Sequence, residues 1–288
     1  MNTFTYRKIK NASLYVLVCL FAGLTAVPLF AILGQVLIKG WRELIVSDFF
    51  VKSTPTTLDA LIALRSGEII PGGIANGIVG TILMVLMATF IAIPIGIFAG
   101  IYLAEYKTSK YASIIRFLTD LLQGVPSIVV GVVGFIWVVI PLKSYSALAG
   151  SAALTVMMLP LIIRSTEETM KMIPNTMKEA GLALGTSYPI IILRVMLPSA
   201  FGGIFTGVLL AVSRVIGETA PLMLTALGST MIQWDVTRPN SAVSLLIWEF
   251  YNDPNLQSLV WSASLFLLIF VLTLNIIAKQ IAKKWRIQ

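Results

Sequence analysis

Six long blocks that contain no Asp, Glu, Lys or Arg limit what this chain can fold into. They are residues 11–38, 69–104, 121–142, 144–163, 195–213 and 254–278. Each block is long enough to cross a bilayer, which takes about 20 helical residues, and each is apolar all round, unlike the striped helix of a soluble core. Because charged residues make up only 12% of the chain, about half of the usual share in soluble domains, the sequence predicts an all-α, polytopic membrane protein with six transmembrane helices.

The expected helices form a single transmembrane domain that takes up residues 1–288. They cover about residues 12–38, 74–104, 147–172, 200–231 and 256–281, together with a third helix that ends near Pro141. The outer segment 39–73 is read as an exposed connection between the first two helices. Gly96 and Gly100 have the spacing that lets two helix backbones approach closely in lipid, so we expect close packing there.

The third helix is interrupted by Gly124, Val125 and Pro126. Proline removes a backbone donor and clashes with the preceding turn, so a kink or break is expected at this point. A break at membrane depth has to be buried in protein or face a water-filled cavity. Residues 124–127 are therefore either part of a transport pathway or a plain kink.

The basic residues indicate how the chain is oriented. The net charge of +8 belongs to a membrane chain, for which nucleic acid is not an expected partner. Placing the N-terminus in the cytoplasm puts most of the 21 Lys and Arg residues inside, as the positive-inside rule expects. The sequence thus predicts a multi-pass membrane protein, in contact with lipid, with both termini in the cytoplasm.

The segment 174–198, between the fourth and fifth helices, has the pattern of a short helical hairpin. Thr176 and Glu179 are spaced as a capping box, which predicts that a helix starts at Thr176. Gly185 is suited to the left-handed conformation that ends such a helix. Pro189 is tolerated in the first turn of a second helix, where its missing donor does no harm.

This segment resembles the EAA loop of ABC importer permeases. The matching residues are, in order, Glu179, Ala180, Gly181 in place of a second Ala, Gly185, Val195 in place of Ile, Leu197 and Pro198. The resemblance implies that residues 174–198 form a cytoplasmic coupling-helix loop, which inserts into a groove of a cytosolic ATPase subunit and transmits ATP-driven closure to the membrane helices.

Charged residues inside the apolar blocks mark a candidate pathway. Arg214 and Glu218 are four residues apart in the expected fifth helix, so they lie on one face and can pair. Charges at mid-membrane are costly and usually functional, and guanidinium has a donor geometry that suits phosphate oxygens. Arg164 with Glu167 or Glu168 repeats this arrangement at the end of the fourth helix. The alternative is that these pairs are purely structural.

Three segments resemble phosphate ABC importer permeases of the PstA type, and the resemblance runs over most of the chain. They are GVPSIVVG at 124–131, LPLIIRSTEE at 159–168, and the run from Ser213 to Leu222. The resemblance implies the type I ABC importer permease architecture, inorganic phosphate as the cargo, and roles for Arg164, Glu167 and Arg214 in phosphate movement. Glu218 joins this set on the physical argument alone.

The resemblance also implies a bacterial or archaeal cytoplasmic membrane as the location, together with a set of partners. These are a homologous second permease subunit, two cytosolic ATPase subunits and an extracytoplasmic phosphate-binding protein. The chain has no G-x-x-x-x-G-K-[ST] loop to hold nucleotide phosphates. We therefore expect a transport subunit that is not an enzyme and has no catalytic residue, metal site or bound cofactor, with ATP and Mg²⁺ held by the partner ATPases.

Three other readings of the function stay open from the sequence. An ABC permease for another oxyanion, such as sulfate or molybdate, would share the loop and the membrane charges. A secondary transporter or channel would use those charges with an ion gradient, but it leaves the pattern at 176–198 without an explanation. A non-conducting membrane scaffold is a third reading, in which the charge pairs only hold helices together.

Overall fold

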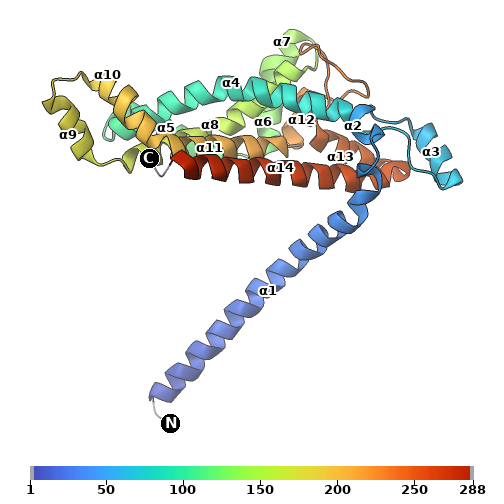
Figure 1. Ribbon diagram of the computed structural model, residues 1–288, viewed down its shortest axis with the longest axis horizontal. Coiled ribbons are helices and arrows are strands. Elements are labelled where there is room, and N and C mark those ends of the chain that lie inside the picture. Colours follow the sequence, from blue (N-terminus) through green and yellow to red (C-terminus); the bar gives the residue numbers. More distant parts are fainter. Residues whose placement is uncertain (1–2, 286–288) are drawn as a thin grey trace.

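The computed structural model describes residues 3–285, and helices fill most of that range (Figure 1). The α-helices are α1 (Thr3–Leu44), α2 (Asp48–Val51), α3 (Thr57–Ser66), α4 (Ala75–Glu105), α5 (Lys110–Gly124), α6 (Ser127–Gly134), α7 (Ile140–Leu142), α8 (Ala147–Lys171), α9 (Asn175–Ala183), α10 (Tyr188–Ile191), α11 (Leu197–Ile216), α12 (Ala220–Thr225), α13 (Val243–Asn252) and α14 (Gln257–Trp285). Two π-helical stretches, η1 (Phe135–Val139) and η2 (Ile192–Met196), and one short 3-10 turn, η3 (Pro254–Leu256), complete the helical elements. The described residues form no β-sheet, so the all-α prediction is confirmed.

Five helical stretches are long and apolar enough to cross a membrane. They are Lys10–Leu44, Ala75–Glu105, Ala147–Lys171, Tyr188–Ile216 and Pro254–Lys283. A sixth span is made by a broken pair, Lys110–Gly124 and Ser127–Leu142, whose axes differ by 107°. The break falls at Val125 and Pro126, where the sequence predicted it. The prediction of six spans is confirmed when this bent pair is counted as one.

The centre of the bundle is the contact between α4 and α8, which pack along a seam of glycines. A Cβ atom on Gly96 would lie 2.6 Å from Cγ2 of Ile162, and one on Gly100 would lie 2.5 Å from Cβ of Thr166. Any side chain at either position would push the two helices apart, so the backbones approach closely because none is present. The close packing predicted from the glycine spacing is confirmed.

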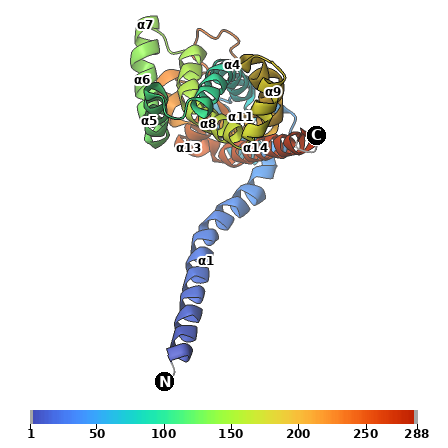
Figure 2. The same ribbon diagram turned by 90° about the vertical axis from the view of Figure 1, so that its left-hand side faces the viewer.

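Helix α1 leaves the bundle and extends away from it, as Figures 1 and 2 show. Only its last turns pack on α14, where a Cβ atom on Gly40 would lie 2.6 Å from Cβ of Leu265. The ammonium of Lys39 lies 4.6 Å from the centre of the Trp261 ring. The remaining side chains of α1 are mostly exposed and apolar, as expected of a helix that lipid surrounds.

The fifth span begins twelve residues earlier than predicted, at Tyr188 instead of 200. Pro198 was predicted to be the last residue of the loop 174–198, and a proline has no N–H to donate to a helix. In the structure the helix passes through this point by forming η2, in which the N–H of Leu197 bonds to the carbonyl of Ile192, five residues back. The π-turn shifts the bonding pattern by one residue, so the missing donor does not stop the helix.

The same span also ends earlier than predicted, at Ile216 instead of 231. The N–H of Gly217 turns back to the carbonyl of Arg214, and that of Glu218 to the carbonyl of Val215, at 3.2 Å each. Pro221 has no N–H to continue an α-helix through Gly217. The chain therefore breaks at 217–219 and resumes as the short helix α12.

Candidate functional site

Glu167 on α8 is the centre of a buried charge network. Its side chain is 1% exposed, and it accepts from Nε of Arg116 at 2.8 Å, Nζ of Lys171 at 2.6 Å and Nη1 of Arg164 at 3.3 Å. Helical spacing supplies two of these partners, since Arg164 and Lys171 are three and four residues away on the same face. A buried carboxylate is stable only with such partners, so Glu167 fixes three cations in one place.

Arg116, on α5, connects three elements of the fold. Besides Glu167, it donates from Nη2 to the carbonyl of Leu103 at 2.6 Å and from Nη1 to the carbonyl of Lys107 at 3.0 Å. Leu103 lies in the last turn of α4, where carbonyls lack helical partners and a cation is favoured. Arg116 therefore joins the end of α4 and the helix α5 to the buried carboxylate of α8.

Arg164 pairs with Glu167, and Glu168 is not its partner. Its other partner is Asp120 of α5, to which Nη2 donates. The side chain of Arg164 is 30% exposed and that of Asp120 is 54% exposed, so this end of the network reaches the surface. Glu168 points instead into a groove between α8 and α11.

Arg214 and Glu218 lie beside the break in the fifth span. Their side chains are 3.6 Å apart between Nε and Oε1, so the predicted pair is present. Arg214 occupies the last turn of α11, and its side chain is 47% exposed, whereas that of Glu218 is 19% exposed. Among the described residues, one carboxylate therefore lies beside the guanidinium, and no hydrogen bond from its other donors is found.

The height of Arg214 follows from its neighbours on α8. The two helices are antiparallel, with Gly207 beside Ser165. Arg214 shares a pocket with Met157 and Pro160. Met157 is ten residues into α8, about 15 Å from its start in a helix about 37 Å long. Arg214 therefore lies at the middle height of α8, although the bounds of its own helix differ from those predicted. Its depth in a bilayer stays a prediction.

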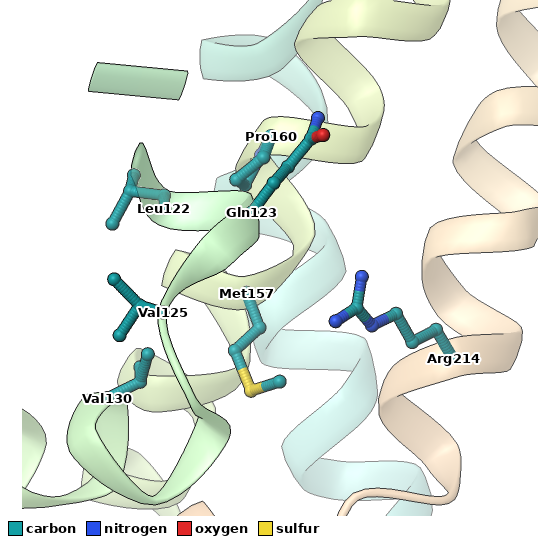
Figure 3. A pocket seen from close by; sticks show the side chains of 7 residues that line it. All are labelled: Leu122, Gln123, Val125, Val130, Met157, Pro160 and Arg214. Atoms are coloured by element: carbon teal, nitrogen blue, oxygen red, sulfur yellow. The ribbon is translucent and has the colours of Figure 1, made fainter. Parts of the chain in front are cut away.

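The break between α5 and α6 faces Arg214 across a small pocket (Figure 3). The pocket is about 10 Å³ in volume, which is the size of a single water. Its lining consists of Leu122, Gln123, Val125, Val130, Met157, Pro160 and Arg214. The predicted break and the predicted arginine, 89 residues apart from Val125 to Arg214, thus line one space. Whether cargo passes there stays a prediction.

Helix α9 begins without the predicted capping box. Thr176 lies inside the first turn, and the N-cap residue is Pro174, which makes no side-chain capping bond. The backbone of Pro174 is extended, with ψ 138°, as an N-cap requires. The helix therefore starts before Thr176 is in a position to cap it. Glu179 and Ala180 are exposed on its surface.

The end of α9 agrees with the prediction. Gly185 has φ 75°, the left-handed conformation that favours glycine. The N–H of Thr186 bonds to the carbonyl of Gly181 at 3.2 Å and that of Gly185 to the carbonyl of Leu182 at 2.9 Å, which is a Schellman motif. A Cβ atom on Gly181 would lie 2.9 Å from Ile191. The two glycines therefore let α9 turn tightly back against α10.

The tip formed by α9 presents apolar side chains. Leu184 is 84% exposed, Leu182 is 50% exposed and Met177 is 36% exposed. An ion pair of 2.7 Å between Lys178 and Glu105 holds α9 to the end of α4. Adjacent exposed apolar residues at a fixed tip are typical of a surface that another protein covers.

Several residues of the network were not among the predicted site residues. Lys171 is four residues from Glu167, so helical spacing could have identified it. Arg116 and Asp120 are 51 and 44 residues from their partners, and no sequence spacing connects them. Leu197 and Pro198, predicted in the coupling loop, lie at the start of α11 instead.

Comparison with known proteins gives one family. A family model described as "Binding-protein-dependent transport system inner membrane component" matches residues 92–287. The chain is 42% identical over 216 residues to a "Phosphate transport system permease protein PstA" of Yersinia pestis, covering 74% of this chain and 73% of that protein. A protein of the same name from Pasteurella multocida is 36% identical over 279 residues, which is 96% of this chain and 95% of its own length.

The fold is similar to that of a solved transporter. A chain of the structure titled "Inward facing conformations of the MetNI methionine ABC transporter" superposes with a TM-score of 0.61. The alignment covers 73% of this chain and 94% of that chain at 18% sequence identity. This likeness confirms the predicted permease architecture and concerns the fold alone.

Proposed function

Because the chain belongs to the family of binding-protein-dependent transport system inner membrane components, and within it to the PstA type, we propose that it moves inorganic phosphate across the membrane as a permease subunit of an ABC importer. The observation that carries this proposal is the similarity to phosphate transport permeases over 96% of the chain. Members of this family are transport subunits, and ATP hydrolysis belongs to separate subunits of the complex.

The charged residues support a pathway for an oxyanion. Arg214 lies at the middle height of α8 with one carboxylate beside it among the described residues, and a guanidinium binds phosphate oxygens through a rigid fork of donors. Glu218 holds that guanidinium when no cargo is present and weakens its attraction for an anion. Arg164 and Glu167 form the next charged level toward α9, so the four predicted residues make two steps of one route.

The assembly that we propose contains a homologous second permease subunit, two ATPase subunits and an extracytoplasmic phosphate-binding protein. Both termini lie in the cytoplasm in this arrangement. The exposed apolar tip of α9 is the surface that docks into the ATPase, since Glu179, Ala180 and Gly185 are accessible there. ATP and Mg²⁺ are bound by the ATPase subunits.

ATP-dependent uptake by the reconstituted complex tests the proposal. Liposomes that contain the complex and the binding protein should take up labelled phosphate when ATP is supplied on the side of the membrane where the ATPase subunits lie. Without ATP on that side they should take up none. Arg214→Ala should lower the rate by at least tenfold, while Arg238→Ala, at an exposed outer pair, should leave it unchanged. Uptake of sulfate or molybdate in place of phosphate would contradict the assignment of phosphate as the cargo. Uptake without ATP would indicate a secondary transporter.

A further inference from the structure

A groove of about 880 Å³ lies between α8 and α11, next to α14 and the start of α9. Small side chains on α11 keep it open, among them Ser199, Gly202 and Thr206. Such a volume is of the size that holds small molecules in proteins, about 300 to 1,000 Å³. Of the four residues assigned to the pathway, only Arg164 lines this groove. The pathway described so far therefore assigns no role to the rest of the groove.

The groove begins one turn from the Arg214 pocket. Leu210 lines the groove and is four residues from Arg214 on the same face of α11. On α8, Leu161 lines the groove and the adjacent Pro160 lines the pocket. From Arg214 to Ser199, at the far end of the groove, is fifteen residues, about 22 Å along the helix.

The charge of the groove is predominantly positive. Its lining contains three cations, Arg164, Lys279 and Lys283, and one carboxylate, Glu168. Arg164 is already paired with Asp120 and Glu167. In contrast, neither lysine forms an ion pair with another residue in the described range 3–285. Two cations in a cleft with low-dielectric walls concentrate anions near it.

We propose that this groove is an exit site that binds a phosphate anion after it leaves Arg214, with Lys279 and Lys283 as the binding cations. The inference rests on the proposed function, and it adds two residues of α14 to the proposed phosphate pathway. Lysine suits an exit site because its ammonium is a strongly hydrated point charge on a flexible stem. The anion is therefore attracted without being fixed in a rigid fork, and it is released to water easily.

Charge-selective labelling of a cysteine in the groove tests this site. Cys19, on the exposed part of α1, is the only cysteine of the chain, so Cys19→Ser gives a clean background. Thr206→Cys then places one thiol in the groove. We expect an anionic methanethiosulfonate to react about tenfold faster than a cationic one, after correction for their rates with a free thiol. Inorganic phosphate should slow the anionic reagent.

The lysines are tested in the same background. Lys279→Gln with Lys283→Gln should abolish the preference for the anionic reagent and lower phosphate uptake, whereas the two Lys→Arg changes should keep both. Lys110→Gln, an exposed cation of α5 outside the groove, is the matched control and should change neither. A preference that survives the double Lys→Gln change would overturn the assignment.

Two further arms separate the possible outcomes. If phosphatidylglycerol protects the thiol in otherwise neutral liposomes and free phosphate does not, the groove holds a lipid headgroup and the proposal is wrong. Phosphate uptake by the Cys19→Ser parent tests the proposed function separately. Uptake with unselective labelling would overturn the exit site alone. Selective labelling protected by phosphate, without any ATP-driven uptake, would support phosphate binding in the groove but overturn the proposed function and with it the role in exit.

Discussion

Replacing Glu167 with Gln removes the negative charge that Arg116, Arg164 and Lys171 share, and it keeps the volume of the side chain. The carboxylate is 1% exposed, so water does not reach its position to replace its interactions with the cations. Removing one partner of a buried ion pair typically costs about 3–5 kcal/mol when the charge left behind is buried. The three cations here are 22–36% exposed, so this range is an upper limit for Glu167→Gln. The shift is about 2–4 °C per kcal/mol for chains of 150–250 residues and smaller for longer ones, so we expect the unfolding temperature to fall by several degrees and by at most roughly 20 °C.

A double-mutant cycle separates the ion pair from other effects of the substitution. Arg116→Gln removes one of the three cations together with its bonds to the carbonyls of Leu103 and Lys107. Residues in one network commonly couple by about 0.5–3 kcal/mol. Glu167→Gln should therefore cost about 0.5–3 kcal/mol less in the Arg116→Gln background than in the wild type.

Thermal unfolding of the purified subunit in detergent measures these effects. Arg238→Gln is the matched control, because its pair with Asp235 is exposed and such pairs contribute about 0–1 kcal/mol. The reasoning is refuted if Glu167→Gln and Arg238→Gln lower the unfolding temperature equally. It is also refuted if the costs of Glu167→Gln and Arg116→Gln are strictly additive.

Three further predictions concern other parts of the molecule. Gly185→Ala should destabilise the α9 turn by about 1–2 kcal/mol, because the residue has φ 75°. This change should also weaken ATPase binding in a pull-down, whereas the Gly185→Asn variant should bind the ATPase more like the wild type. Gly96→Leu should separate α4 from α8, since even a Cβ atom there would lie 2.6 Å from Ile162, and it should lower the yield of folded protein on size-exclusion chromatography. Glu249 lies on α13, outside the six spans, and burial raises the pKa of its carboxyl group. The folded state therefore keeps the carboxyl proton to higher pH than the unfolded state does, so stability falls as pH rises through the raised pKa. Glu249→Gln should remove that fall, which unfolding temperatures measured from acidic to neutral buffer would show.

The sequence predicted the elements whose cause is local. Pro126 marks the break in the third span, and Gly185 marks the end of α9, because each residue type has one dominant backbone effect. The loop boundary predicted at Pro198 was wrong, because η2 lets the helix continue through this proline. A single proline therefore indicates a disturbed hydrogen bond, but the sequence alone does not show whether the helix ends or accommodates it with a π-turn.

The candidate site was predictable only in part. The pairs Arg214–Glu218 and Arg164–Glu167 follow from helical spacing, and both are present. The contribution of Arg116 depends on how α5 packs against α8, which no periodicity in the sequence encodes. The same holds for Lys279, which faces the groove only because α14 lies beside α11.

One continuous helical segment, Tyr188–Ile216, leads from the turn after α9 to the level of Arg214. It acts as a stiff rod of 29 residues, about 43 Å long. Tilting such a rod by about 10° about one end displaces the other by about 7 Å, which is more than the rise of a full helical turn. The π-turn at Ile192–Met196 is the one interruption of α-helical bonding within it, near the end where a push from a docked protein would arrive. A displacement of the end near Tyr188 would therefore be transmitted to Arg214, because continuous helix connects the two.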